Sequence, residues 1–274
     1  MNSGKYILVD GSFVLLDDYR ISLNESECLR ISEKFRSVRT TIPFFRETLE
    51  LLKLKLMIYN QSIPEFTEND GAGLLRQLGR TLTKNKHFMG ACLTVVFWFD
   101  EQQPHYIIQS EKLEEADYVF NEKGLFLEVF DKIQKPVSAL SNLTIGSEIF
   151  WKIARSQKSF QADEQLILNT DDQIVETPYS NIYLVNGKSV RTSGEIHGAY
   201  MDVTQPIMKN IFERLNLSYD DSEGISLTNL EDAEEIMLVN PIDGVRWVAG
   251  FEGKRYFNNN IRKICRLFGQ MAIS

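Results

Sequence analysis

Glu176 is the residue whose place in the sequence most favours chemistry. It ends the short apolar stretch Ile174–Glu176 and stands five residues before Asn181 in the segment ADEQLILNTDDQIVETPYSNIY. A carboxylate among apolar residues must find an arginine, a backbone N–H donor or a cationic ligand, because an unpaired buried charge is costly. The ordinary alternatives are a solvated Glu176 or a Glu176 that pairs with a nearby arginine such as Arg191 or Arg246.

The cysteines and histidines form no comparable pattern. They show neither a CxxC pair nor the spacing of metal ligands. These residues are Cys28, Cys92, Cys265, His87, His105 and His197. Three widely separated cysteines indicate reduced thiols, without a disulfide framework or a zinc site. We therefore predict no metal.

Composition and charge restrict the classes of partner. The 274 residues carry a net charge of −8, and Lys and Arg are scattered among Asp and Glu, so we expect no nucleic-acid partner. An apolar fraction of 43% is ordinary for a globular protein. No apolar run is long enough for a signal peptide or a membrane span, so we expect a cytoplasmic protein without a membrane partner.

The hydrophobic pattern predicts an α+β chain with two domains, residues 1–120 and 121–274. Apolar residues that recur three and four apart predict helices, and alternating or continuous apolar runs predict strands. The expected helices cover 43–59, 73–84, 145–157, 203–215 and 259–268, and one expected strand covers 124–130. Asn186-Gly187 is the strongest hairpin signal. Strands in hairpins exclude a doubly wound fold.

The segment from Ala162 to Tyr183 resembles the corresponding stretch of fold-type IV enzymes, which use pyridoxal 5'-phosphate (PLP). These include class IV aminotransferases, such as branched-chain and D-amino acid aminotransferases, and aminodeoxychorismate lyases. Residues 34–57, 190–214 and 233–248 are also similar to parts of this family. The resemblance implies that Glu176 contacts the pyridine nitrogen and that Asn181 is structural. It further implies a small N-terminal α/β sandwich, a larger C-terminal sheet or pseudo-barrel domain, and a homodimer.

The family's Schiff-base lysine is absent from its expected place. That lysine begins a Lys-Thr-x-Asn-like motif just before a helix, and counting back 32 residues from Glu176 (176 − 144) reaches Thr144. Ser147 then stands where Asn is usual, and neither Thr144 nor Ser147 can form an imine. Lys135 and Lys152 are alternatives, but each requires an insertion or deletion in this register.

The family's phosphate anchors are replaced as well. The resemblance puts Pro241 at the position of a hydroxyl ligand, and Pro has neither a hydroxyl nor a backbone donor. The tripeptide Gly198-Ala199-Tyr200 replaces a Gly-Ile-Thr-like loop, and its backbone amides could still bind an anion. The anchoring arginine falls at Leu51, with Arg39 or Arg46 as alternatives.

Three functions remain open. The favoured one is a homologue inactive in PLP chemistry, for which no cofactor is expected and whose cleft is empty or binds a small anionic metabolite. The second is an active aminodeoxychorismate lyase or amino acid aminotransferase that binds PLP through a displaced lysine. The third is a different enzyme with Glu176 as acid or base and Tyr200 or Thr144 as its partner.

Overall fold

The structure is a computed structural model that describes residues 3–20, 28–61, 63–100 and 103–273. It divides into two compact units, the first ending at Asp117 and the second running from Tyr118 to Ala272. The predicted division lay three residues later, after Phe120. Within the described ranges, no helix has both the length and the apolar character needed to cross a membrane.

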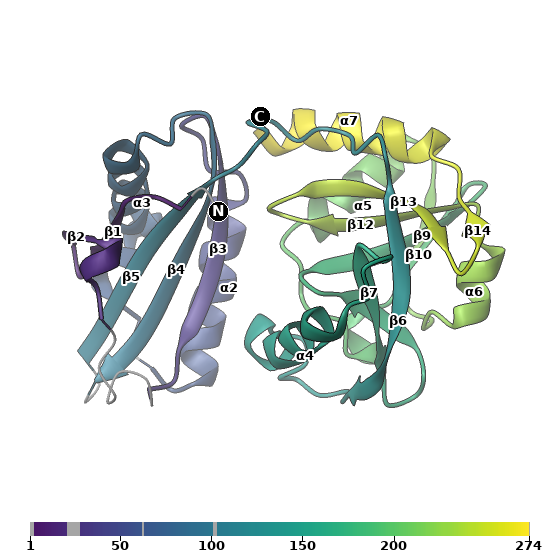
Figure 1. Ribbon diagram of the computed structural model, residues 1–274, viewed down its shortest axis with the longest axis horizontal. Coiled ribbons are helices and arrows are strands. Elements are labelled where there is room, and N and C mark those ends of the chain that lie inside the picture. Colours follow the sequence, from purple (N-terminus) through teal and green to yellow (C-terminus); the bar gives the residue numbers. More distant parts are fainter. Residues whose placement is uncertain (1–2, 21–27, 62, 101–102, 274) are drawn as a thin grey trace. The chain divides into compact units, whose positions relative to one another are not determined.

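The first unit is a five-stranded antiparallel sheet in the order β2-β1-β5-β4-β3. Its strands are β1 (Tyr6–Val9), β2 (Ser12–Leu15), β3 (Ile31–Val38), β4 (Gly90–Asp100) and β5 (Gln103–Lys112). Helices α2 (Phe45–Ile58) and α3 (Ala72–Asn85) pack against the sheet (Figure 1), accompanied by the 3-10 turns η1 (Leu16–Asp18), η2 (Glu65–Thr67) and η3 (Asn69–Gly71). The core forms because alternate residues of β4, such as Leu93 and Val95, are fully buried with the leucines of both helices.

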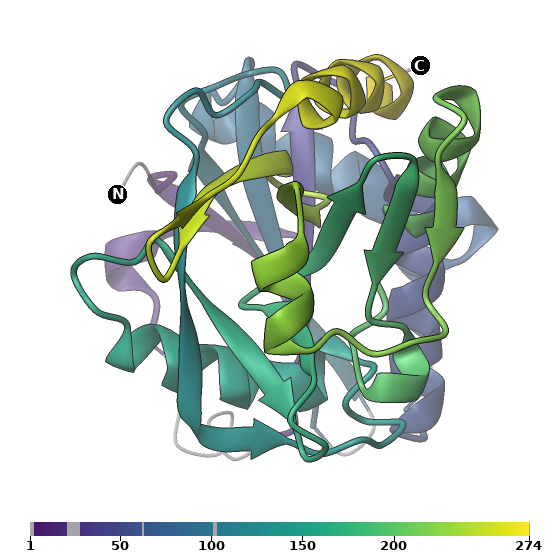
Figure 2. The same ribbon diagram turned by 90° about the vertical axis from the view of Figure 1, so that its right-hand side faces the viewer.

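The second unit is built on a sheet that closes on itself (Figure 2). Six strands in the order β9-β12-β13-β6-β7-β8 form a ring that the pairing of β8 with β9 completes. The strands are β6 (Leu125–Lys135), β7 (Glu164–Asn169), β8 (Ile174–Thr177), β9 (Ser180–Asn186), β10 (Ser189–Thr192), β11 (Ser218–Asp220), β12 (Glu235–Asn240), β13 (Gly244–Phe251) and β14 (Lys254–Arg255). The helices are α4 (Thr144–Gln157), η4 (Glu195–His197), α5 (Gln205–Arg214), α6 (Leu227–Asp232) and α7 (Asn259–Ile273). The predicted α+β architecture, a small sandwich and a larger barrel-like unit, is confirmed.

Strand β6 runs five residues beyond its predicted end at Phe130. The residues that follow, 131–134, are exposed, and most are polar, so the apolar pattern ends before the strand does. The pairing of β6 with β7 is irregular here, because Phe130 pairs with Ile167 and Lys135 pairs with Asn169. This bulge returns the chain to the ladder at Lys135, whose side chain is fully buried.

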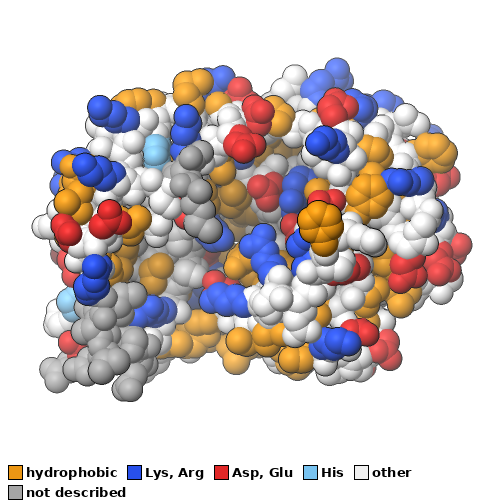
Figure 3. All heavy atoms as spheres, viewed as in Figure 1, with side chains coloured by type: hydrophobic (Ala, Val, Ile, Leu, Met, Phe, Trp, Pro, Cys, Tyr) orange, Lys and Arg blue, Asp and Glu red, His pale blue; other side chains and the backbone are white. Residues whose placement is uncertain are grey.

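Local signals account for several other elements. The Asn186-Gly187 signal lies in the hairpin between β9 and β10, where Gly187 has a φ of 56° and Asn186 pairs with Ser189. Helix α6, which the hydrophobic pattern did not predict, begins with a reciprocal cap between Ser226 and Asn229. On the face of the second unit seen in Figure 3, acidic and basic side chains are interspersed.

Candidate active site

An ion pair between Lys135 and Glu176 lies in the interior of the second unit. Lys135 Nζ donates to Glu176 Oε1 at 2.8 Å, and both side chains are 0% exposed. Lys135 is the last residue of β6, and Glu176 is on β8. The residue that meets Glu176 is therefore Lys135, whereas the sequence register gave this place to Thr144.

Glu176 accepts hydrogen bonds from two further N–H groups. The indole Nε1 of Trp151 on α4 donates to Oε1 at 2.6 Å, and the backbone N–H of Tyr200 donates to Oε2 at 2.8 Å. With the Lys135 ammonium, three N–H donors meet this carboxylate. They satisfy both oxygens of an ionised carboxylate, which only accepts hydrogen bonds.

Aromatic rings enclose this ion pair. The Trp151 ring lies 4.6 Å from the ring of Tyr179 and 5.0 Å from the ring of Tyr200, the latter in an edge-to-face arrangement. Tyr179 occupies the turn between β8 and β9 with a φ of 66°, a backbone conformation that costs free energy in a residue other than glycine. The rings exclude water from the pair and strengthen its electrostatic interaction.

The ammonium of Lys135 has an altered proton affinity. Burial lowers the pKa of Lys135, and the neighbouring Glu176 carboxylate opposes that change only in part. A lysine with a lowered pKa loses its proton more readily near neutral pH, which makes its amine available as a nucleophile.

Asp202 forms a second buried acidic group next to the ion pair. The Tyr200 hydroxyl lies 2.8 Å from Asp202 Oδ2 and 3.0 Å from the backbone oxygen of Tyr179, and the Thr204 N–H donates to Asp202 Oδ1 at 2.7 Å. Burial raises the pKa of Asp202 to about 6, although the Thr204 and Tyr200 donors lower it. A phenol has one proton, which the Tyr200 hydroxyl shares between Asp202 Oδ2 and the backbone oxygen of Tyr179; a protonated Asp202 can instead donate to the phenol oxygen and leave that proton to Tyr179.

Asn181 lies opposite Glu176 in the β8–β9 ladder and leaves one acceptor without a donor. Its Nδ2 donates to the backbone oxygen of Tyr200 at 3.3 Å, but its buried Oδ1 has no hydrogen-bond partner among the described residues. A buried acceptor of this kind favours a ligand or a water that can donate to it.

The other residues of the predicted lysine motif lie apart from this network. Thr144 is the half-buried first residue of α4, and Ser147 is buried and donates to the backbone oxygen of Ser141 at 2.8 Å. Lys152, the second alternative, is exposed and pairs with Glu148 on the same helix. The assignment of Thr144 to the lysine position therefore has no support in the contacts of Glu176.

The predicted phosphate-loop amides are largely committed to the protein. In the tripeptide Gly198-Ala199-Tyr200, the Gly198 N–H donates to the oxygen of Glu195, and the Tyr200 N–H donates to Glu176. The backbone oxygen of Pro241 accepts from the hydroxyl of Tyr118 at 2.7 Å. The loop is thus less free to bind an anion than the sequence suggested.

The alternative arginines belong to the first unit. Arg39 forms two hydrogen bonds with the carboxylate of Asp117 at 2.8 and 2.9 Å, while Arg46 is on the first turn of α2. Leu51 lies on the same helix and is half-buried.

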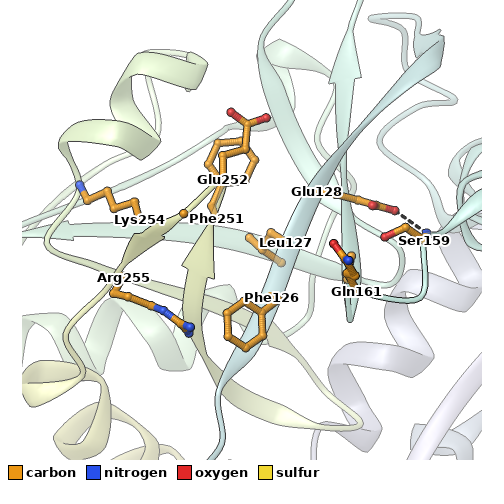
Figure 4. Close-up of a pocket in the computed structure, with 11 residues that line it drawn as sticks. Phe126, Leu127, Glu128, Ser159, Gln161, Phe251, Glu252, Lys254 and Arg255 are labelled. Carbon is orange, nitrogen blue, oxygen red and sulfur yellow. Dashed lines mark hydrogen bonds between the residues drawn. The ribbon is translucent and has the colours of Figure 1, made fainter.

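A separate pocket of about 350 Å³ lies near the start of β6 (Figure 4). Its Glu128 accepts from the backbone N–H of Ser159, and Lys254 donates to backbone oxygens, so these two charged groups have partners. Seven residues of β6 separate Glu128 from Lys135, roughly 20 Å along a strand. This pocket therefore does not belong to the ion-pair site.

Comparison with known proteins identifies the fold. No protein-family model and no curated protein matches this chain. The branched-chain aminotransferase of Thermoproteus uzoniensis with norvaline is 16% identical, and the match covers 98% of this chain and 95% of that one, with a TM-score of 0.80. The enzyme of Escherichia coli is 14% identical over 95% and 92% of the two chains, with a TM-score of 0.78. That of Thermobaculum terrenum in its PLP-bound form is 11% identical over 100% and 95%, with a TM-score of 0.79. This chain has the fold of the branched-chain aminotransferases.

The aminotransferase fold corrects one prediction. We expected no cofactor because the lysine was missing, yet solved structures of this fold contain PLP or pyridoxamine 5'-phosphate. The prediction of no cofactor is therefore wrong against the structures of this fold. The resemblance to fold-type IV enzymes is confirmed at the level of the fold.

Sequence reasoning set aside one residue of this buried network and missed two others. Lys135 was considered as an alternative lysine, but it required an insertion or deletion in the register that led to Thr144. Trp151 and Asp202 carry no sequence signal for their roles, since each acts through contacts between separate elements.

Proposed function

We propose that this protein is a PLP-dependent aminotransferase of the class IV type. In this proposal Lys135 binds the aldehyde of the cofactor, and Glu176 pairs with its ring nitrogen. The observation that carries the proposal is the fully buried contact of 2.8 Å between Lys135 Nζ and Glu176 Oε1. A lyase that uses the same cofactor is the alternative within this class.

The residues at the site fit the chemistry of the cofactor. The group supplies an electrophilic aldehyde and an electron-withdrawing ring, which need an amine and a carboxylate on opposite sides. Lys135 is an amine whose pKa burial lowers, Glu176 is a carboxylate held by N–H donors, and Asn181 Oδ1 is an acceptor without a donor among the described residues. Because Lys135 and Glu176 touch, a ring between them requires that this contact opens and that the ammonium loses its proton.

Each side chain then has a defined task. Lys135 would hold the cofactor through its amine, and an amine at this place could also take up or give a proton beside a bound substrate. Glu176 would hold the ring nitrogen, and the aromatic rings of Trp151, Tyr179 and Tyr200 would keep water from the pair.

The decisive experiment is covalent trapping. The protein is mixed with PLP, reduced with borohydride, digested and analysed by mass spectrometry, alongside Lys135→Ala and the surface control Lys152→Ala. We expect the native protein and Lys152→Ala to carry the label on Lys135, and Lys135→Ala to carry none. Absence of labelling in the native protein overturns the proposal and returns the inactive homologue, and labelling of another lysine overturns the role of Lys135.

Substrate choice and assembly need separate measurements. Because the solved structures of this fold are branched-chain aminotransferases, we propose aliphatic amino acids as the first substrates to test. Transfer of the amino group to a 2-oxo acid separates an aminotransferase from a lyase, which releases its product without an acceptor. The homodimer remains a prediction, which light scattering after gel filtration tests.

A further inference from the structure

Two segments of the second unit converge at the buried ion pair. Residues 136–142, here called the outer segment, leave β6 directly after Lys135. Residues 195–201, here called the inner loop, include Tyr200, whose backbone N–H donates to Glu176 at 2.8 Å. Because the two charged side chains touch, the outer segment and the inner loop begin or end on either side of the same contact.

Asn142 joins the outer segment to the inner loop through three hydrogen bonds. Its Nδ2 donates to the backbone oxygens of Glu195 and Ala199, each at 2.8 Å. Its backbone oxygen accepts from the Met201 N–H at 2.7 Å. Both amide protons of one side chain are therefore used to hold the two segments together.

Little apolar packing holds the outer segment in place. Residues 136–140 are all exposed, and Val137 and Leu140 leave 42% and 49% of their surface to solvent. The contact with the inner loop is largely one between backbones, because a Cβ atom on Gly198 would lie 3.4 Å from the backbone oxygen of Pro136. A segment that buries so little apolar surface opens locally at a low cost in free energy.

The inner loop has further attachments to the rest of the unit. The side chain of Asn169 donates to the backbone oxygen of His197 at 2.9 Å, and the His197 ring lies 3.1 Å from the backbone oxygen of Ser222. The part that can separate is therefore the outer segment, which begins at the residue after Lys135.

We propose that Asn142 is a positioning residue that controls access to the Lys135 amine. While its side chain holds the inner loop, the outer segment covers the lysine. When its two side-chain hydrogen bonds break, the outer segment moves away and small carbonyl compounds reach the amine. The inference rests on the proposed function for what enters, but its test uses no cofactor.

The test measures how fast Lys135 reacts with an amine reagent in the folded protein. The native protein, Asn142→Ala and the control Asn121→Ala are pulsed with sulfosuccinimidyl acetate, and acetylated peptides are quantified by mass spectrometry. Asn121 is a matched control because its side chain also forms two hydrogen bonds, at 2.7 and 2.9 Å, with the backbone of Trp247 near the opposite end of β6. The exposed Lys152 is the internal reference.

We expect Lys135 to be acetylated roughly tenfold to a hundredfold faster in Asn142→Ala than in the native protein, since two hydrogen bonds no longer oppose opening. Asn121→Ala should leave this rate unchanged, and Lys152 should react at one rate in all three proteins. An unchanged rate in Asn142→Ala overturns the proposal. An equal rise in Asn121→Ala also overturns it, because lost stability would then explain the effect.

Hydrogen exchange separates local opening from global unfolding. The Met201 N–H, which donates to the backbone oxygen of Asn142, should exchange faster in Asn142→Ala by the same factor. Its rate should not change in dilute urea, because local opening exposes little surface. A rate that rises with urea as steeply as that of the barrel strands overturns the proposal. If both readouts meet the expectation but borohydride traps no PLP on Lys135, the proposed function alone is overturned.

Discussion

Asp202→Asn is expected to stabilise the second unit at neutral pH. The structure buries Asp202 and gives it three neighbours, the Thr204 N–H, the Tyr200 hydroxyl and, through that hydroxyl, the backbone oxygen of Tyr179. An asparagine side chain has one acceptor and one donor group, as the protonated carboxyl of Asp202 does, and it carries no charge. Its oxygen can accept from Thr204, and its amide can donate to the Tyr200 oxygen, which frees the phenol proton for Tyr179.

The magnitude follows from the raised pKa of Asp202. Burial raises this pKa from 3.8 to about 6, a change of roughly 2.2 pH units (6 − 3.8), which corresponds to about 3 kcal/mol. Between these two values the folded protein holds a proton that the unfolded chain has lost. The contribution of Asp202 to the free energy of unfolding therefore falls as the pH rises from about 4 to about 6 and no longer changes above that.

Urea denaturation across this pH range tests the prediction. Fluorescence in a Trp98→Phe background follows the second unit, because Trp151 and Trp247 are then the remaining tryptophans of the chain. Asp202→Asn should match the native protein near pH 4 and exceed its stability by up to about 3 kcal/mol near pH 7. Asp171→Asn, an exposed aspartate, should show no such difference. A destabilisation by Asp202→Asn that is equal at every pH would refute the reasoning.

Four further predictions concern the ion pair and one helix cap. Glu176→Gln leaves the Lys135 ammonium buried without a carboxylate and should lower the free energy of unfolding by about 3–5 kcal/mol. Lys135→Met should lower the free energy of unfolding by less in the same urea assay, because Glu176 keeps the N–H donors of Trp151 and Tyr200. A larger loss in Lys135→Met than in Glu176→Gln would contradict this reasoning. The rate at which PLP attaches should rise with pH around a midpoint below 10.5, the ordinary pKa of lysine, because burial lowers the pKa of Lys135. A midpoint at or above 10.5 argues against Lys135 as the attachment site. Ser226→Ala should cost about 1 kcal/mol in thermal or urea unfolding by removing the N-cap of α6, and no loss would show that this cap does not stabilise the unit.

Much of the fold could be predicted because its signals are local. The hydrophobic period located the longer helices, and Asn186-Gly187 located a hairpin. Glu176 and Asn181 were found together because they are close in sequence and pair across two adjacent strands. These features need only a few residues of context.

The lysine that meets Glu176 could not be located by counting along the chain. Lys135 lies 41 residues before Glu176 (176 − 135), and the assumed separation of 32 residues led to Thr144. The apolar pattern also gave no reason to expect a buried residue at Lys135, because residues 131–134 of β6 are exposed and its pairing with β7 is irregular there. A bulge is defined by the pairing of two strands, and the sequence of one strand does not reveal it.

The contacts of Trp151 and Asp202 required the folded chain. Trp151 lies on a helical face that reads as ordinary core, and its hydrogen bond to Glu176 depends on where α4 meets the sheet. Asp202 precedes a helix and would be expected at the surface, but the Tyr200 and Thr204 donors hold it inside.

Glu176 also belongs to the seam of the barrel. Two residue pairs join β8 to β9, Glu176 with Asn181 and Thr177 with Ser180, and this short ladder is what turns an open sheet into a closed ring. A substitution that loosens these pairs exposes unpaired backbone groups along β8, which invites pairing between molecules. A substitution at Glu176 that loosens this seam should therefore promote aggregation in addition to removing the partner of Lys135.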